Sequence, residues 1–388
     1  MPAIRHALLG LLIMVAACTG SRNFPAPGPD LNTQANPPGY QNVRFYGQGE
    51  GGIVDAEIAT VRRQIRERIA REGEVPNNGL YDVLVLSGGG PDGAFGAGLL
   101  NGWTTRGDRP EFALVTGIST GSLIAPFAFL GPEFDPELKK FYTQTATDDV
   151  VSFEVLAGLL GRAGLTDTTP IRGILERQIT PEFVALIAAE HLKGRRLWVG
   201  TSDLDAQRPV IWDVGAIAAS GREDAPALIQ QVLLASASIP GAFPPVLIDV
   251  EANGEQFTEL HMDGGVTRQL FLFPAEAPFR PQEEEEAAVM VRGSVYAIRN
   301  SKLVPEYAET EPGILQIAAR SVSTLLKSGG INDIAVLNEQ AGDADFEVFV
   351  IAVPETFNEP SKELFDKTYM QALYNVGYEM GAGGVPWF

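Results

Sequence analysis

Short apolar segments alternate with helical segments along most of this 388-residue chain, and this alternation constrains the fold more than any other feature. Each apolar segment is rich in Val, Ile, Leu or aromatic residues, as expected of strands buried in a sheet. The expected strands are residues 83–86, 112–115, 197–201, 210–212, 295–298 and 348–351, and helical patterns include 55–71, 171–179, 182–191 and 313–326. Alternation of this kind predicts an α/β fold with a central, mainly parallel sheet flanked by helices.

The composition fits one large globular body and limits its partners. With 45% hydrophobic and 20% charged residues, the chain can bury a sizeable core. No clear linker divides residues 51–388, so we expect one domain there, with its core at about 81–300. The formal net charge of −20 argues against nucleic acid as a partner, because phosphate backbones bind basic faces. The sequence carries no signal for an oligomeric state.

The N-terminus has the features of an export signal. Residues 7–17 form an apolar run that is shorter than the roughly 20 residues needed to span a bilayer. The run ends in Val15-Ala16-Ala17-Cys18, which resembles the lipobox of bacterial lipoproteins and contains the only cysteine. We expect a signal peptide at 1–17, lipidation of Cys18, and an exported protein anchored to a membrane, in the outer membrane or facing the periplasm. The alternative is an ordinary secretory signal. Residues 18–50, rich in Pro, Asn and Gly, are expected to form a flexible linker.

Ser119 stands in the pattern Gly117-Ile118-Ser119-Thr120-Gly121, a G-x-S-x-G elbow. A predicted strand precedes this pattern and an apolar helical stretch (123–130) follows it, which is the strand–turn–helix context that the elbow requires. The two glycines allow the tight turn and keep the space around the serine hydroxyl open. The helix N-terminus beneath the serine favours developing negative charge. The pattern therefore indicates Ser119 as a candidate nucleophile.

A glycine-rich segment, Gly88-Gly89-Gly90-Pro91-Asp92-Gly93, follows the first predicted strand. The backbone N–H groups of its first three glycines suit an oxyanion hole, because acyl transfer needs donors aimed at the oxygen that becomes negative. The same spacing, Gly88-x-Gly90-x-x-Gly93, is also a dinucleotide fingerprint, with Asp108 about 20 residues on as a ribose-binding acid. The segment alone leaves both interpretations open, the second being a nucleotide-binding oxidoreductase. A P-loop is excluded, because no Gly-Lys-Ser/Thr follows.

Asp263-Gly264-Gly265 supplies the third part of the pattern. The aspartate follows a strand-like stretch (257–262), and the two glycines allow the backbone to approach closely. An exposed carboxylate with a pKa of about 4 is a poor base for a serine. Burial in an apolar pocket raises that pKa, and a hydrogen bond from Ser119 aligns the proton transfer. Asp263 is therefore a candidate base, and the alternative is an ordinary Asp-Gly turn.

Histidine is scarce in this chain. Only His191 and His261 lie outside the expected signal peptide, so a Ser-His-Asp triad has few options. His191 ends a helical pattern, which favours a capping role. His261 lies two residues before Asp263 and in a strand points to the same side, yet a packing or hydrogen-bonding role is favoured for it. Two histidines also make a zinc site improbable, and no cofactor is expected.

Together these residues resemble the patatin-like phospholipase family. The resemblance runs from about residue 81 to 266 and includes two further segments, Thr-Ser-Asp-Leu-Asp at 201–205 and Ala-Ser-Ala-Ser-Ile-Pro-Gly-Ala-Phe-Pro-Pro at 235–245. It implies a three-layer fold and a lipid acyl hydrolase in which Ser119 is the nucleophile and Asp263 the base. It also implies an oxyanion hole at Gly88, Gly89 and Gly90, with the motif glycines Gly93, Gly117, Gly121, Gly264 and Gly265 in supporting positions.

The sequence departs from the family pattern at Asp92, where the family usually has Arg or Lys. An anion at this position favours neutral esters over phosphate-bearing substrates, or leaves the enzyme slow. The expected partners are a lipid or phospholipid acyl ester and the membrane that holds the N-terminal anchor. The alternative to an enzyme is a patatin-fold lipoprotein that is weak or inactive as a catalyst and acts as a lipid-binding or scaffold module.

Overall fold

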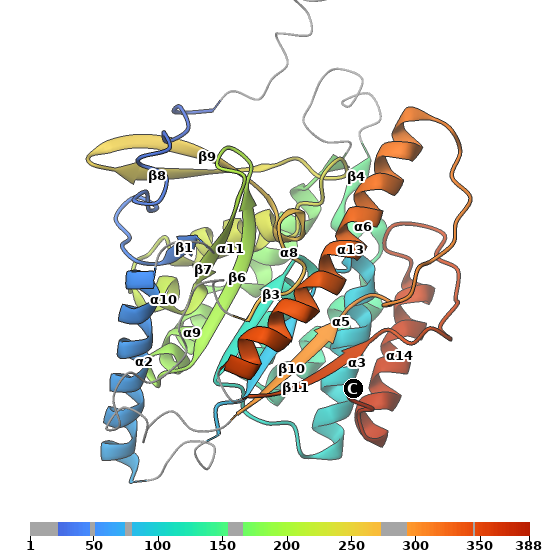
Figure 1. Cartoon of the computed structure of the whole chain (residues 1–388), viewed down its shortest axis with the longest axis horizontal. Helices are drawn as coiled ribbons and strands as arrows, with labels where there is room; N and C mark the ends of the chain where they lie inside the picture. Colours follow the sequence, from blue (N-terminus) through green and yellow to red (C-terminus); the bar gives the residue numbers. More distant parts are fainter. Residues whose placement is uncertain (1–21, 47–50, 74–79, 154–165, 273–292, 344–345) are drawn as a thin grey trace, which may run out of the picture.

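The computed structural model describes residues 22–46, 51–73, 80–153, 166–272, 293–343 and 346–388. Within these ranges the chain forms an α/β body built around one nine-stranded sheet (Figure 1). Its strands are β1 (Arg44–Tyr46), β2 (Val83–Leu86), β3 (Leu114–Ile118), β6 (Arg196–Asp203), β7 (Arg208–Asp213), β8 (Val246–Ala252), β9 (Glu255–Asp263), β10 (Ser294–Arg299) and β11 (Glu347–Ala352). A separate two-stranded sheet pairs β4 (Ser152–Phe153) with β5 (Thr166–Asp167).

The middle of the large sheet is parallel. Strands β6, β3, β2, β10 and β11 lie side by side in that order, and each neighbouring pair is parallel. Antiparallel strands extend one side, where β7 and β1 follow β6, and the β8–β9 hairpin also joins β6. The predicted α/β fold with a mainly parallel sheet is therefore confirmed. Because parallel strands end at the same edge, the segments after β2, β3 and β10 meet there.

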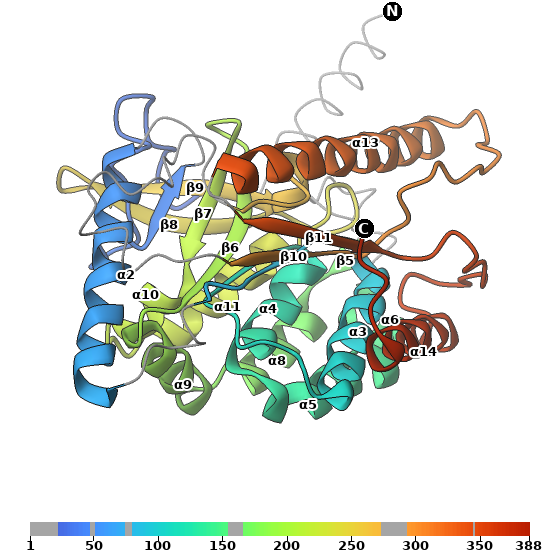
Figure 2. The same cartoon turned by 60° about the horizontal axis from the view of Figure 1, so that its bottom comes forward.

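Helices cover both faces of the sheet, which makes three layers (Figure 2). The long helix α13 lies on one face, and α3, α4, α5 and α14 lie on the other. The helices are α2 (Gly51–Glu72), α3 (Gly93–Arg106), α4 (Thr120–Leu130), α5 (Asp135–Gln144), α6 (Thr147–Val150), α8 (Thr169–Gln178), α9 (Pro181–Leu192), α10 (Val214–Ala219), α11 (Ala225–Ser236), α13 (Ile314–Asp343) and α14 (Lys367–Gly383), with short 3₁₀ helices η2 (Gly90–Asp92), η3 (Pro132–Phe134) and η4 (Gly264–Val266). No described helix is both long enough and apolar enough to cross a membrane.

Helix α13 extends well beyond the helical pattern expected at 313–326. It continues through Gly329-Gly330 to Asp343, although adjacent glycines usually weaken a helix. A packing requirement accounts for one of them, because a Cβ atom at Gly330 would lie 1.7 Å from Nη1 of Arg299. The glycine therefore lets the last residue of β10 pass directly beneath the helix.

The described part of the expected linker differs from the expectation of a flexible tether. Strand β1 pairs with β7, and the backbone N–H of Thr258 donates a hydrogen bond to the carbonyl of Pro25 at 3.0 Å. Arg44 is buried and ion-paired with Glu259 of β9. These contacts join residues 22–46 to the body of the domain. The expected signal peptide and Cys18 lie outside the described residues.

Candidate active site

Ser119 sits on a strained turn between β3 and α4. Its φ and ψ angles are 54° and −127°, a conformation that non-glycine residues rarely adopt and that marks nucleophile elbows. The backbone N–H of Ser119 donates to Oγ of Ser236 at 3.0 Å, and its carbonyl accepts from Oγ of Ser122 at 2.6 Å. Neighbouring helices therefore hold the elbow on both sides, which allows the strained backbone to persist.

The two elbow glycines are required by close contacts between backbones. A Cβ atom at Gly117 would lie 2.5 Å from the carbonyl oxygen of Gly121. A Cβ atom at Gly121 would lie 2.4 Å from the carbonyl oxygen of Leu86, at the end of β2. Only glycine fits at either position, so the elbow can press against the start of the glycine-rich segment.

Asp263 ends β9 and is placed beside the elbow. Strand β9 pairs with β6, with Asp263 opposite Thr201, and the backbone N–H of Asp263 donates to the carbonyl of Ser238 at 3.0 Å. Its Oδ1 accepts the backbone N–H of Gly265 at 2.7 Å. The two segments that flank it, η4 and the turn after α11, thus fix the carboxyl group in one orientation.

The side chain of Ser119 lies close enough to the Asp263 carboxyl group to favour its ionised form. Each residue is only 5% exposed. Burial raises the pKa of Asp263 to about 6, although the nearby Ser119 side chain and the backbone N–H of Gly265 oppose the rise. The carboxyl group is therefore a stronger base than an exposed aspartate and still ionises near neutral pH.

The glycine-rich segment follows β2 and lines the same cleft as Ser119 and Asp263. Among the residues that the structure describes, none accepts a hydrogen bond from the backbone N–H groups of Gly88, Gly89 or Gly90. Buried Asn300 holds the segment, since its side chain donates to the carbonyl of Ser87 at 2.9 Å and accepts from the backbone N–H of Gly96 at 3.1 Å. The loop is thus fixed from behind, and its first three N–H groups remain available to a ligand.

The carboxylate of Asp92 is hydrogen-bonded to Tyr369 of α14. Its Oδ1 accepts a hydrogen bond from the hydroxyl of Tyr369 at 2.6 Å. Burial raises the pKa of Asp92 to about 6, while the Tyr369 bond opposes the rise. The anion that replaces the expected cation therefore takes up a proton more readily than an exposed aspartate and is held by the domain itself.

A cleft of about 820 Å³ opens above these residues. The glycine-rich segment, Ser119, Asp263 and the segment 239–242 form its floor, and α13 forms a wall with Gln316, Ala318, Ala319, Val322, Ser323, Leu326 and Lys327. Ala318, Ala319, Val322 and Leu326 give the helix wall an apolar surface beside its polar residues, and the reactive groups lie at the serine. Such a cleft suits a ligand with an apolar chain and one reactive polar group.

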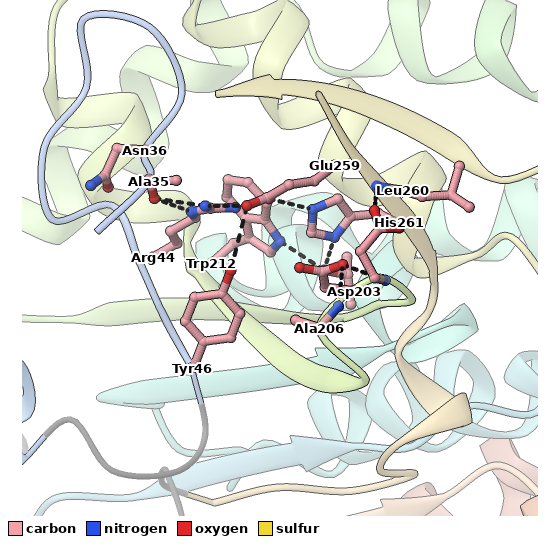
Figure 3. A network of polar contacts seen from close by, with 12 residues as sticks. Ala35, Asn36, Arg44, Tyr46, Asp203, Ala206, Trp212, Glu259, Leu260 and His261 are labelled. Atoms are coloured by element: carbon pink, nitrogen blue, oxygen red, sulfur yellow. Dashed lines mark hydrogen bonds and ion pairs between the residues drawn. The ribbon is translucent and has the colours of Figure 1, made fainter. Parts of the chain in front are cut away.

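His261 belongs to a buried polar network beside the strand that carries Asp263 (Figure 3). Its Nδ1 lies 3.0 Å from Oγ1 of Thr201 and its Nε2 lies 3.0 Å from Oε2 of Glu259. Glu259 in turn accepts from Nη2 of Arg44 at 2.8 Å. Both ring nitrogens are therefore engaged away from Ser119, in keeping with the hydrogen-bonding role expected from the sequence.

Two other candidates from the sequence lie apart from the serine. His191 is in the last turn of α9, where burial lowers its pKa to about 3. Asp108 follows the end of α3, a helix of 14 residues that starts at the glycine-rich segment. It is therefore about 20 Å from that segment, and it accepts a hydrogen bond from Arg106 at 2.6 Å. This placement gives no support to the dinucleotide interpretation. Within the described ranges, no three His, Cys, Asp or Glu side chains gather to hold a metal ion.

Gln269 and Arg299 line the cleft and were not found from the sequence. The amide nitrogen of Gln269 donates to the carbonyl of Gly265 at 3.3 Å, which ties the turn after the aspartate to the floor of the cleft. Arg299 is the last residue of β10. A charged residue at the end of an apolar strand is a detectable signal, since such positions fall at the ligand-binding edge of a parallel sheet.

The sheet, the elbow and the buried carboxyl group together define an α/β protein with a hydrolase-type site. Residues 84–276 match the model of the patatin-like phospholipase family, and the chain carries a patatin-like phospholipase domain over this range. Members of this family are esterases and phospholipases, which supports hydrolase chemistry for this chain.

Comparisons beyond the family model add little detail. VipD from Legionella pneumophila is 13% identical, with a TM-score of 0.35 over 76% of this chain and 67% of that chain. Among curated proteins, a search finds no match to this sequence.

Proposed function

We propose that this protein hydrolyses acyl esters of lipids with Ser119 as nucleophile and Asp263 as base. The observation that carries the proposal is the close placement of these two buried side chains, with the serine on a strained elbow. The family match supports the reaction class, and the apolar wall of the cleft supports a substrate with an acyl chain.

In the first half of the reaction, Oγ of Ser119 attacks the ester carbonyl carbon while its proton passes to Asp263. The carbonyl oxygen becomes negative and is stabilised by the N–H groups of Gly88, Gly89 and Gly90. When the tetrahedral intermediate collapses, the bond to the alcohol oxygen breaks and that oxygen takes the proton from Asp263. The alcohol leaves, and the acyl group remains on Ser119.

In the second half, Asp263 accepts a proton from water, and the water oxygen attacks the acyl carbonyl carbon. Collapse of this second intermediate returns a proton to Oγ of Ser119 and releases the fatty acid. One group thus acts as base and then as acid in each half, so no histidine is needed.

A fluorophosphonate probe tests whether the serine is activated. We expect stoichiometric labelling of Ser119, mapped by peptide mass spectrometry, together with hydrolysis of p-nitrophenyl acyl esters or phospholipids. Label is expected to disappear in Ser119→Ala and to persist in Ser301→Ala, because Ser301 lines the same cleft but is not on the elbow. A wild-type protein that neither takes the label nor hydrolyses any ester of the panel would favour the lipid-binding or scaffold module instead.

We also propose that the protein is exported and anchored to a membrane through Cys18. The support is the sequence Val15-Ala16-Ala17-Cys18 at the end of an apolar run. In bacteria fed a labelled fatty acid, wild-type protein is expected to incorporate the label and to remain in the membrane fraction. Cys18→Ser is expected to lose both properties. Equal labelling of the two proteins would overturn the anchor.

A further inference from the structure

Arg299 lies at the same edge of the sheet as the serine and the glycine-rich segment. Strands β3, β2 and β10 are adjacent and parallel, with Leu86 paired to both Gly117 and Ile298. Arg299 follows Ile298 directly, so it stands level with the start of the glycine-rich segment. Neighbouring strands are about 4.8 Å apart, which places the backbone of β10 about 10 Å from that of β3. A ligand bound at Ser119 and extending across the loop would therefore reach Arg299.

The guanidinium group of Arg299 is buried with donors to spare. The residue is only 2% exposed, yet it lines the cleft. Its Nη2 donates to the carbonyl of Lys327 at 3.3 Å. In the part of the chain that the structure describes, Nε and Nη1 have no hydrogen-bond partner. A buried charge without partners is costly, so this arrangement indicates a group that receives a ligand.

The surrounding protein holds the Arg299 guanidinium group in place. Among the described residues, no carboxylate forms a direct ion pair with it. Gly330 of α13 leaves the space that Nη1 occupies. Asp333, also on α13, is near enough to favour the charged form, although burial lowers the pKa of Arg299. The carboxylate of Asp333 is itself used by the backbone N–H groups of Gln269 and Leu270. Residues of α13 therefore hold the side chain of Arg299, and among the residues described its Nε and Nη1 groups stay unpaired.

The other cleft cation is already paired. Lys327 forms an ion pair with Glu306 at 2.8 Å. The cleft anion Asp92 is engaged by Tyr369. Of the charged groups in the described wall of the cleft, Arg299 is therefore the cation with unused hydrogen-bonding capacity.

We propose that Arg299 binds a phosphate oxyanion in the cleft, most directly the headgroup phosphate of a phospholipid whose ester lies at Ser119. Guanidinium groups bind phosphate through charge-assisted N–H bonds, and within the described ranges Nε and Nη1 are each an unused donor for such a bond. The headgroup assignment rests on the proposed function. The proposal also revises the expectation, drawn from Asp92, that neutral esters are favoured over phosphate-bearing substrates. The cation that the glycine-rich segment lacks is supplied by Arg299 of β10.

Binding is tested directly in the full chain with Ser119→Ala, which prevents turnover. The probes are hexyl phosphate, hexanol and inorganic phosphate, measured by calorimetry. Replacing Arg299 with Met is expected to weaken hexyl phosphate about 10- to 100-fold, the range for a hydrogen bond to a charged group, and to leave hexanol unchanged. Arg299→Lys is expected to recover part of the affinity. Arg320→Met, on α13 but outside the cleft lining, serves as the control and should bind like the parent.

Kinetics separate the phosphate site from a structural role. Arg299→Met is expected to lower kcat/KM for dihexanoyl phosphatidylcholine about 10- to 100-fold and to keep that for dihexanoylglycerol within about twofold. An equal loss on both substrates, or no loss on either, overturns the proposal. If inorganic phosphate binds as tightly as hexyl phosphate and does not compete with phospholipid, the site belongs to free phosphate.

The two proposals fail in different ways. Wild type that hydrolyses neither lipid but binds hexyl phosphate through Arg299 would refute the hydrolase and keep the phosphate site. Alternatively, the protein could hydrolyse both lipids in a way that requires Ser119 but does not change when Arg299 is replaced. That result would support the hydrolase and refute the phosphate site.

Discussion

Ser119→Ala is expected to lower kcat for a p-nitrophenyl acyl ester by about 10⁴-fold or more, the size of loss seen when a serine nucleophile is removed. Asp263→Asn is expected to lower kcat by about 10²- to 10⁴-fold, because the amide keeps the shape of the carboxyl group but accepts no proton. The double variant should lose little more than Ser119→Ala alone, since the two groups act as one unit. Steady-state kinetics on purified variants measure all three.

The rate of ester hydrolysis should depend on pH through the ionisation of Asp263. Burial raises the pKa of Asp263 to about 6, and a base acts only when it is ionised. Hydrolysis of a neutral ester is therefore expected to rise between about pH 5 and 7. Asp92, whose pKa is also raised to about 6, provides the comparison, because Asp92→Asn should keep the same rise. A profile that is flat from pH 4.5 to 7 in wild type would argue against Asp263 as the base.

The Asp263→Asn substitution should also stabilise the fold. A folded pKa above the unfolded one means that ionising Asp263 opposes folding as pH rises from about 4 to 6. The shift corresponds to about 3 kcal/mol at neutral pH, and the asparagine side chain carries no such charge. Asp263→Asn is therefore expected to lose activity as described above while being no less stable than wild type. His261→Gln is the control for activity, because its ring contacts Thr201 and Glu259 rather than the serine. A loss in His261→Gln as large as in Asp263→Asn would contradict the dyad.

Glu259→Gln is expected to lower the free energy of unfolding by about 3–5 kcal/mol, the cost of leaving one partner of a buried ion pair alone. Arg44 and Glu259 have side chains that are 1% and 0% exposed, so bulk solvent does not reach the partner that is left. Arg44→Met should cost a similar amount. Because each single variant leaves an unpaired charge, the double variant should lose less than the sum of the two.

The contribution of the Arg44–Glu259 ion pair to the free energy of unfolding should decrease at low pH. Burial alone would raise the pKa of Glu259, but the Arg44 guanidinium outweighs it and lowers the pKa to about 2. The folded pKa lies below the unfolded value of about 4.3. The contribution is therefore complete above about pH 4.5 and is lost as pH falls toward 2.

Urea unfolding monitored by circular dichroism measures these changes. The exposed pair of Arg63 and Glu67, with side chains 58% and 60% exposed, supplies the control, and Arg63→Met should change stability by no more than about 0.5 kcal/mol. Single variants at Arg44 and Glu259 that match this control would show that β1 does not stabilise the domain. The functional consequence is that a chain lacking residues 22–46 should be destabilised, although the composition of this segment is typical of a linker.

Much of the fold follows from local patterns. The strands at 83–86 and 295–298 and the helices at 171–179 and 182–191 appear in the structure nearly as predicted, because each has a continuous apolar run or a helical period of its own. Residues 22–46 differ because their packing depends on a buried arginine and on pairing with a distant strand. Composition alone cannot distinguish such a segment from a tether, since its partners lie about 200 residues away.

The candidate site divides in the same way. Ser119, the three glycines and Asp263 were identified from short motifs, because tight turns impose glycine at particular positions. The sequence also restricted the choice of base by its shortage of histidine. The tertiary structure added that the side chains of Ser119 and Asp263 lie close together and that His261 turns toward Glu259. It also placed Arg299 in the cleft. These three facts depend on which strands are neighbours and on which side of each strand faces the cleft, and the order of strands in a sheet differs from their order in the chain.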